Sequence, residues 1–166
     1  MKMTKPFKFQ EEDVERIQYF GGRALDAKEP GLGKSFTALL WYERHMHPKD
    51  PLVIVCPATP KWNWQNEVRT HLGRDSEVLS GTKSFPLVGG RGSIYIVNYD
   101  IVHAWAGEFK KILPGLIVLD EVHYLKDSGS RRSKSCKYLC DSVPYVLGLS
   151  GTPMVNRPAE LWNILK

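Results

Sequence analysis

The chain has 166 residues, of which 42% are hydrophobic and 25% charged, and its formal net charge is +5. This length suits one domain with its own core, and the composition is typical of a soluble globular protein. The sequence contains no run of about 18 apolar residues, so we expect no membrane span, and residues 1–6 lack the apolar stretch of a secretory signal. The basic balance favours a polyanionic partner only weakly, because many ordinary proteins are as basic.

The first half of the chain alternates amphipathic and apolar segments. Val14, Ile17 and Phe20 recur at spacings of three, which predicts a helix over 11–20. A weaker strand candidate at 23–27 leads to a glycine loop. The segments that follow predict, in order, a helix over 35–46, a buried strand over 52–56, and a helix over 61–72 that begins after Pro60.

The second half continues this alternation. Residues 73–92, which are rich in Gly, Ser and Thr, are expected to form an irregular connection. Continuous apolar runs predict strands over 94–97, 116–119 and 145–149, and helices are expected over 132–140 and 158–165. Buried strands that alternate with helices predict an α/β fold with a mostly parallel sheet and helices on both faces. We find no linker and expect one domain over residues 1–166.

The three cysteines, Cys56, Cys136 and Cys140, make no even set of disulfides. Cys136 and Cys140 are four residues apart and could share a helix face. A zinc site normally has about four ligands, however, and the sequence offers no second pair. We therefore expect reduced thiols in an intracellular protein, of the cytoplasm or the nucleus.

A glycine-rich segment follows the first strand candidate and precedes a helix; its residues are Gly31, Leu32, Gly33, Lys34 and Ser35. Glycines let successive backbone N–H groups face phosphate oxygens, and the helix N-terminus adds its positive dipole end. Lys34 can reach the terminal phosphates of a nucleotide, and the Ser35 hydroxyl can ligate Mg²⁺. The strict pattern asks for glycine at position 28, which is lysine here, so a surface turn capped by Ser35 stays open as the alternative.

Asp120 and Glu121 follow the apolar strand over 116–119, and ligands of open parallel sheets bind at the carboxyl ends of strands. Asp120 is expected to hold Mg²⁺ through water, and Glu121 to orient and deprotonate the attacking water. His123 either reports the nucleotide state to a neighbouring motif or is a structural histidine. A lone Asp-Glu pair is common, but a glycine-lysine loop followed by such a pair is the pattern of a P-loop NTPase.

Further motifs follow in a fixed order from residue 9 to residue 162. They are Phe9-Gln10, Val53-Ile-Val-Cys-Pro57, Trp62-Asn-Trp-Gln-Asn-Glu67, Ile96-Val-Asn-Tyr99, Asp120-Glu-Val-His123, Leu149-Ser-Gly-Thr-Pro153 and Arg157-Pro-Ala-Glu-Leu-Trp162. This series resembles the first RecA-like lobe of superfamily 2 helicases, specifically the Swi/Snf-type DNA translocases. Within that family it is most similar to the annealing-helicase branch.

The resemblance implies ATP and Mg²⁺ as cofactors and assigns roles to residues at one site. Gln10, with Phe9 beside it, would read the adenine edge, since an amide both donates and accepts hydrogen bonds. Lys34, Asp120 and Glu121 would be the catalytic residues. Ser35 and Asp120 would hold the metal, and the loop over 31–35 would hold the phosphates.

The resemblance also implies double-stranded DNA as a partner, gripped mostly through its backbone. Gly151 and Thr152, with His123, would couple hydrolysis to DNA binding. Pro57, Lys61, Asn98 and Tyr99 lie in segments that face the tracking DNA strand in the family.

The sequence departs from the family pattern in two respects. Lys28-Glu29-Pro30 stands in place of Asp-Glu-Met; Pro30 removes a backbone donor and Lys28 replaces an acid with a base, so we expect an altered grip on phosphate. The family motor also has two lobes, and arginines from the second are worth about 10³–10⁵ in rate. We therefore expect this chain to hydrolyse ATP slowly or not at all until a second RecA-like lobe is supplied in cis or in trans.

Two further groups of residues permit either a DNA contact or an ordinary structural role. Trp62 and Trp64 could stack on bases, although burial against the sheet is the commoner fate of large aromatic residues. Arg131, Arg132 and Lys134 could contact phosphates, or they could form a solvated helix start. The sequence alone leaves both questions open.

The prediction that unites these observations is an ATP-binding lobe of a DNA translocase or helicase-like motor. The first alternative is a stand-alone, non-catalytic lobe that binds DNA or a partner motor as a regulator. This alternative predicts DNA binding whose affinity changes neither with nucleotide nor with Lys34→Ala. Another P-loop enzyme, such as a small kinase, is disfavoured by the Ser150-Gly-Thr-Pro segment and by the absence of an obvious lid.

Overall fold

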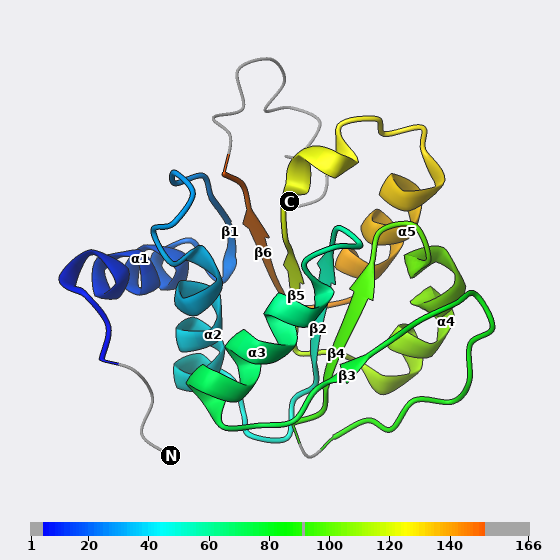
Figure 1. The fold of residues 1–166 in the computed structure, drawn as a ribbon, viewed down its shortest axis with the longest axis horizontal. Helices are drawn as coiled ribbons and strands as arrows, with labels where there is room; N and C mark the ends of the chain where they lie inside the picture. Colours follow the sequence, from blue (N-terminus) through cyan, green and yellow to red (C-terminus); the bar gives the residue numbers. More distant parts are fainter. Residues whose placement is uncertain (1–4, 91, 152–166) are drawn as a thin grey trace.

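The computed structural model describes residues 5–90 and 92–151, and its centre is a six-stranded sheet (Figure 1). Across the sheet the strands are β1 (Arg23–Asp26), β6 (Tyr145–Leu149), β5 (Leu116–Leu119), β2 (Leu52–Cys56), β4 (Ile94–Asn98) and β3 (Glu77–Val78). Every neighbouring pair is parallel, which confirms the predicted parallel sheet. The carboxyl ends of the strands therefore lie along one edge.

The central strands consist of the apolar runs that the sequence predicted as buried. Every residue of β2, β4 and β5 is buried, because helices cover both faces of the sheet. The register pairs Cys56 with Asn98, and Val55 with Leu119. The residues that follow these strands, Asp120 among them, consequently reach the same edge.

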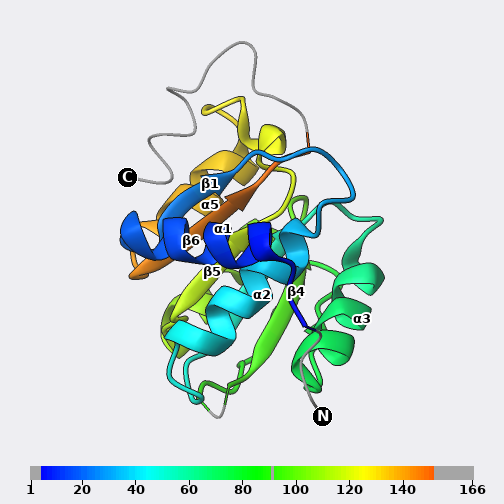
Figure 2. The same cartoon turned by 90° about the vertical axis from the view of Figure 1, so that its left-hand side faces the viewer.

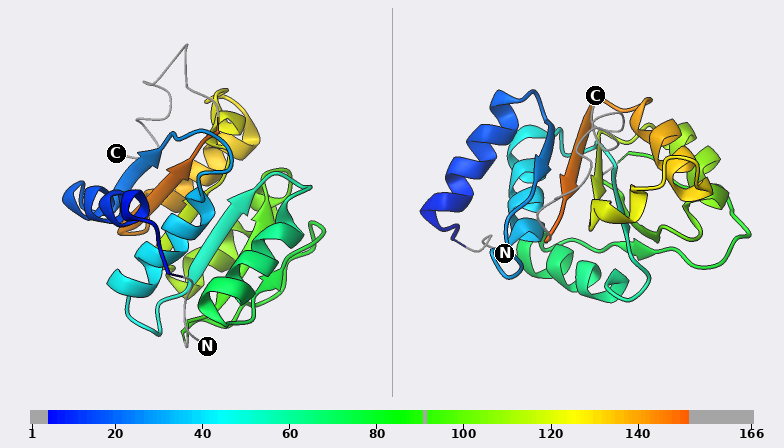
Figure 3. Two further views of the ribbon diagram at one scale, coloured as in Figure 1. Left: turned by 60° about the vertical axis from the view of Figure 1, so that its left-hand side comes forward. Right: turned by 90° about the horizontal axis from the view of Figure 1, so that it is seen from above.

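Within the described residues, five α-helices form the two outer layers (Figures 2 and 3). Helices α1 (Lys8–Tyr19), α2 (Lys34–His45) and α3 (Lys61–Leu72) lie on one face, and α4 (Val102–Ile112) and α5 (Arg131–Cys140) lie on the other. Alternate strand residues enter the two cores, since side chains alternate across a strand. Ile54 packs with α1–α3, for example, while Val53 and Val55 pack with α4 and α5.

Three elements differ from the sequence predictions. Helix α4 lies in a stretch for which no helix was expected, and it buries Val102, Trp105 and Phe109 on one side. The residue before it, Ile101, gives no side-chain cap, so the usual start signal is missing. Strand β3 is a two-residue strand within the connection expected to be irregular, and a 3₁₀ helix, η1 (Val122–Leu125), follows the Asp-Glu pair.

The remaining boundaries agree with the predictions to within a few residues. Helix α1 begins at Lys8 rather than at 11, which places Gln10 inside the helix. The predicted helix over 158–165 lies outside the described residues. Across the described ranges, none of the helices has both the length and the apolar character of a membrane span.

Candidate nucleotide-binding site

The glycine loop connects β1 to α2 and adopts a backbone that requires glycine at two positions. Gly31 has φ +83° and Gly33 has φ +68°, in the left-handed region that favours glycine. A Cβ on Gly31 would meet no atom within 4 Å, whereas one on Gly33 would lie 2.5 Å from Gln10 Nε2. Gly33 is thus needed for the close approach of α1, and Gly31 leaves open space beside the loop.

Lys34 begins α2, and its ammonium group lies against the loop itself. Its Nζ donates to the carbonyl oxygens of Lys28 at 2.9 Å and of Glu29 at 3.0 Å. Burial raises the pKa of Asp120, and the Trp64 hydrogen bond and the positive charge of Lys34 oppose that rise. The glycine loop and the acidic pair meet where Pro30 and Glu121 both approach Gly151, although Lys34 and Asp120 are 86 positions apart in the sequence.

Gln10 is buried, with 5% of its surface exposed, although it is a polar residue. Its Oε1 accepts from the backbone N–H of Phe7 at 2.9 Å, and its Nε2 lies against Gly33. Phe9 stacks on Phe7 with ring centroids 5.8 Å apart. The residues predicted to read adenine thus stand beside the glycine loop.

Asp120 lies at the end of β5 and is held from both sides. Its Oδ2 accepts from the indole N–H of Trp64 at 2.8 Å, and its backbone carbonyl accepts from the Tyr99 hydroxyl at 2.7 Å. Burial raises the pKa of Asp120 above its ordinary value, and the Trp64 hydrogen bond opposes this rise. A fixed carboxylate with one oxygen bonded to an indole keeps acceptor capacity for metal-bound water.

Glu121 connects three predicted motifs. Its backbone has φ +51°, in the left-handed region that costs a non-glycine residue about 1–2 kcal/mol. Its Oε2 accepts from the backbone N–H of Gly151 at 3.3 Å and lies 3.2 Å from His123 Nδ1. A Cβ on Gly151 would approach Pro30 Cγ to 3.2 Å and Glu121 Oε1 to 3.4 Å. The glycine loop, the acidic pair and the Ser-Gly segment therefore meet at one point, whereas Thr152 lies outside the described residues.

The residues predicted to face DNA differ in their exposure. Lys61 is partly exposed, and its Nζ donates to Asn98 Oδ1 and to the Leu79 carbonyl, both at 3.1 Å. Asn98 is 6% exposed and Tyr99 is 1% exposed, so neither side chain lies at an open surface in this structure. Pro57 is partly exposed at the same edge. Tyr99 supports Asp120 through its hydroxyl, a role that sequence reasoning missed.

The two tryptophans of the WNW segment separate into the two roles considered for them. Trp64 is 2% exposed and packs in the core between α1–α3 and the sheet, whereas Trp62 is 61% exposed. Sequence reasoning missed the hydrogen bond of Trp64 to Asp120, because it joins residues 56 positions apart. The sequence indicated only that Trp64 would be buried against the sheet.

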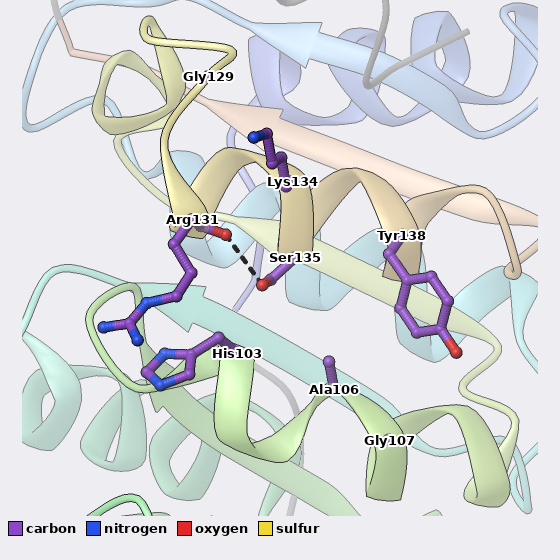
Figure 4. A pocket seen from close by; sticks show the side chains of 8 residues that line it. All are labelled: His103, Ala106, Gly107, Gly129, Arg131, Lys134, Ser135 and Tyr138. Carbon is purple, nitrogen blue, oxygen red and sulfur yellow. Dashed lines mark hydrogen bonds between the residues drawn. The ribbon is translucent and has the colours of Figure 1, made fainter.

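Arg131 and Lys134 line an open hollow of about 550 Å³ between α4 and α5, with His103 opposite them (Figure 4). Tyr138 closes the hollow at its other end, and Lys110 Nζ lies 3.9 Å from the centre of that ring. Arg132 lies instead over the Tyr124 ring, at 5.9 Å. These side chains give the outer surface of α4 and α5 a basic strip.

Lys28, the first departure from the family pattern, makes its side-chain contacts with carboxylates. Its ammonium forms ion pairs with Asp13 of α1 and with Asp26 Oδ2, the latter at 3.2 Å. The charge of Lys28 is thus taken up by two carboxylates, and the altered grip on phosphate expected from the sequence stays a prediction. Pro30, the other departure, packs against Gly151.

The cysteines lie in the cores. All three are buried and free, and burial raises the pKa of Cys56 and of Cys140 to about 12. Cys136 and Cys140 pack among apolar residues of α4, α5 and the sheet. Within residues 5–90 and 92–151, no three His, Cys, Asp or Glu side chains are grouped as a protein-only metal site would require.

Comparison with known proteins identifies the family of this chain. The family model described as the SNF2-related domain matches residues 23–166. The chain belongs to this SNF2-related family. That membership confirms the resemblance found in the sequence, although the match begins after helix α1 and Gln10.

Several curated proteins are similar over most of this chain. A Caenorhabditis elegans homolog of the SWI/SNF-related matrix-associated actin-dependent regulator of chromatin subfamily A-like protein 1 is 34% identical over 163 residues, or 96% of this chain. The ISWI chromatin-remodeling complex ATPase CHR11 of Arabidopsis thaliana is 26% identical over 162 residues, or 90% of the chain. This SNF2-related chain spans only 24% and 15% of the lengths of these two relatives.

The fold is also that of a solved structure. The SWI2/SNF2 ATPase core of Sulfolobus solfataricus, in complex with dsDNA, superposes with a TM-score of 0.80 at 20% identity. The alignment covers 99% of this chain and 37% of the other. The predicted RecA-like lobe, with a parallel sheet between two helical layers, is thereby confirmed.

Proposed function

We propose that this chain is the ATP-binding lobe of an ATP-dependent DNA translocase. The observation that carries the proposal is the meeting of Lys34, Asp120, Glu121 and Gly151 at the carboxyl ends of β1, β5 and β6. Ligands of open parallel sheets bind at this edge. The phosphates would lie along the loop over 31–35, with the adenine beside Gln10.

The oxygen groups at this edge fit Mg²⁺, which prefers hard oxygen ligands and keeps several waters. Ser35 would contribute its hydroxyl, and Asp120 would hold a metal-bound water while Trp64 fixes its orientation. Bound Mg²⁺ would neutralise charge on the phosphates. An intracellular location fits the three buried thiols that form no disulfide.

Glu121 is the base that the proposal requires. Its carboxylate stands between the Gly151 amide and His123, and would take a proton from the attacking water. Lys34 would exchange its bonds to loop carbonyls for bonds to phosphate oxygens. Efficient hydrolysis would need arginines from a second RecA-like lobe in cis or in trans, worth about 10³–10⁵ in rate.

A nucleotide-binding and hydrolysis assay tests the proposal. Lys34→Ala should weaken binding of Mg-ATP about 10–100-fold, because it removes a charge-assisted hydrogen bond. Glu121→Gln should retain binding, and Lys49→Ala is the matched control, since Lys49 is exposed in the turn between α2 and β2. Turnover by the chain alone should be negligible with or without double-stranded DNA.

Each contrary outcome has a distinct meaning. DNA-stimulated turnover that both Lys34→Ala and Glu121→Gln abolish would overturn the need for a second lobe. DNA binding that is indifferent to ATP and to Lys34→Ala, with no ATP binding, would favour the alternative of a non-catalytic regulator.

We also propose that double-stranded DNA is gripped through its phosphates, with the basic strip on α4 and α5 contributing. Replacing both Arg131 and Lys134 by alanine should weaken DNA binding without changing ATP affinity. It should also reduce the slope of log affinity against log salt by about one for each DNA phosphate that is no longer neutralised. An unchanged slope would exclude the strip from the DNA interface.

A further inference from the structure

Lys28 is the one position before the glycine loop where this chain carries a base in place of the family's acid, and it is largely withdrawn from solvent. Its side chain is 20% exposed and stands between two carboxylates, Asp13 at 17% and Asp26 at 10% exposure. Its ammonium also lies 5.6 Å from the centre of the Phe9 ring. Arg16 approaches Asp13 to 3.9 Å from the outer side. Two positive and two negative charges therefore balance in this cluster.

The same residue contacts the phosphate loop through its backbone. The carbonyl oxygen of Lys28 accepts a hydrogen bond from Lys34 Nζ at 2.9 Å. The side chain of Lys28 thus binds α1, while its main chain binds the lysine proposed to hold the phosphates. Asp13 and Gln10 both belong to α1, one turn apart, and Gln10 Nε2 lies against Gly33 of the loop.

Helix α1 has few other strong polar connections to this part of the molecule. Glu11 forms a bidentate ion pair with Arg44 of α2, but both side chains are about two-fifths exposed, so salt screens this pair more than a buried one. The contacts of Lys28 are charge-assisted as well, and they are less exposed than the Glu11–Arg44 pair. Together with the apolar packing of Val14 and Ile17, the contacts of Lys28 therefore position Gln10 relative to Lys34.

We propose that Lys28 is a positioning residue that holds the adenine-side helix α1 against the phosphate loop. This inference rests on the proposed function, because it concerns the same nucleotide. Lys28 would not contact the nucleotide itself. It would set the distance between the base-reading Gln10 and the phosphate-binding Lys34, so that both ends of ATP are engaged together.

The test compares two ligands that share phosphates but differ in the base. Affinities of Mg-ATP and of Mg-tripolyphosphate are measured by calorimetry for the native chain, Lys28→Met, Lys28→Arg and the surface control Lys49→Met. Lys28→Met should weaken ATP binding about tenfold and tripolyphosphate binding less than about threefold. Lys28→Arg should recover most of the ATP affinity, because it keeps the charge between the two carboxylates.

Equal losses for both ligands would overturn the proposal, because they would indicate that Lys28 acts on phosphate. Asp13→Asn should reproduce the effect of Lys28→Met, and the double variant should lose no more than either single variant. Additive losses would also overturn it. Thermal unfolding of each variant establishes that a loss of affinity is not a loss of folded protein.

A measurement without nucleotide separates this proposal from the proposed function. Amide hydrogen exchange of residues 8–19 should accelerate in Lys28→Met and in Asp13→Asn, but not in Lys49→Met. If the native chain bound neither ligand, the proposed function would fail. Accelerated exchange in the variants would still support the inference that Lys28 holds α1 against the phosphate loop. Unchanged exchange in both variants would overturn the positioning role of Lys28, whichever ligands the chain binds.

Discussion

Two buried tryptophans on opposite faces of the sheet each donate an indole N–H, but the two hydrogen bonds have different roles. Trp64 of α3 is 2% exposed, and Trp105 of α4 is fully buried. Each donates its indole N–H over a similar distance, Trp64 to Asp120 Oδ2 at 2.8 Å and Trp105 to the Gly81 carbonyl at 3.0 Å. The first bond orients a carboxylate of the candidate site, and the second holds a loop to the core.

This contrast extends to the two helical layers. The layer of α1–α3 carries Gln10, Lys34 and Trp64, which all reach the carboxyl edge of the sheet. The layer of α4 and α5 buries two thiols and presents a basic outer surface. Substitutions in the two layers should therefore separate the stability of the fold from the chemistry of the site.

The largest expected effect is the same in both layers. Replacing either Trp64 or Trp105 by alanine should lower the free energy of unfolding by about 3–5 kcal/mol, because each leaves a large cavity in a closed core. Urea denaturation with a single transition measures both. A much smaller loss for Trp64→Ala would show that its side of the core relaxes around the cavity, and would weaken the comparison.

Replacement by phenylalanine should separate the two tryptophans. Each substitution removes a partly buried indole hydrogen bond and some packing volume, and should cost about 1–3 kcal/mol. Only Trp64→Phe should raise the pKa of Asp120 further, since the indole hydrogen bond is the main contribution that lowers it. Carbon-detected NMR titration of Asp120 would measure this shift, and an equal shift in Trp105→Phe would contradict the assignment.

The sequence predicted β2, β4, β5 and β6 well because each is an apolar run that a doubly covered sheet requires, whereas β1 contains Arg23 and Asp26 and the two-residue β3 was not predicted. Helix α4 was not predicted, because Ile101 gives no side-chain cap and so no start signal. The bond of Trp64 to Asp120 and the ion pairs of Lys28 were not predictable either. They depend on where α3 and α1 lie against the sheet, which local periodicity does not specify.

Asp120→Asn should stabilise the fold while it removes the proposed metal ligand. Burial raises the folded pKa of Asp120 above its ordinary value of 3.8, so the ionised carboxylate destabilises the folded chain at neutral pH. Asparagine carries no charge and can still accept from Trp64, so a gain of about 0.5–2 kcal/mol is expected. Below pH 3.8 both the folded and the unfolded native chain bind the proton, and the gain should vanish there. If the stability gained by Asp120→Asn instead increased toward acid pH, the raised pKa of Asp120 would be contradicted.

The smallest expected effect concerns two residues at opposite ends of β5. Leu113 precedes the strand with φ +52°, and Glu121 follows it with φ +51°. Asparagine tolerates this conformation better than either, so each substitution should recover up to about 1 kcal/mol of strain. Leu113 is 70% exposed and should show the full gain, whereas Glu121→Asn also loses the bond to Gly151.

Thermal unfolding beside ATP turnover of the completed two-lobe motor distinguishes the two positions. Leu113→Asn should leave turnover unchanged, and Glu121→Asn should abolish it. Equal stability gains with unchanged turnover in both variants would mean that the strain at Glu121 serves the turn into η1 alone. Because the same φ occurs at a position remote from the site, backbone strain does not by itself identify the catalytic residue. The contacts of Glu121 with Gly151 and His123 make that distinction.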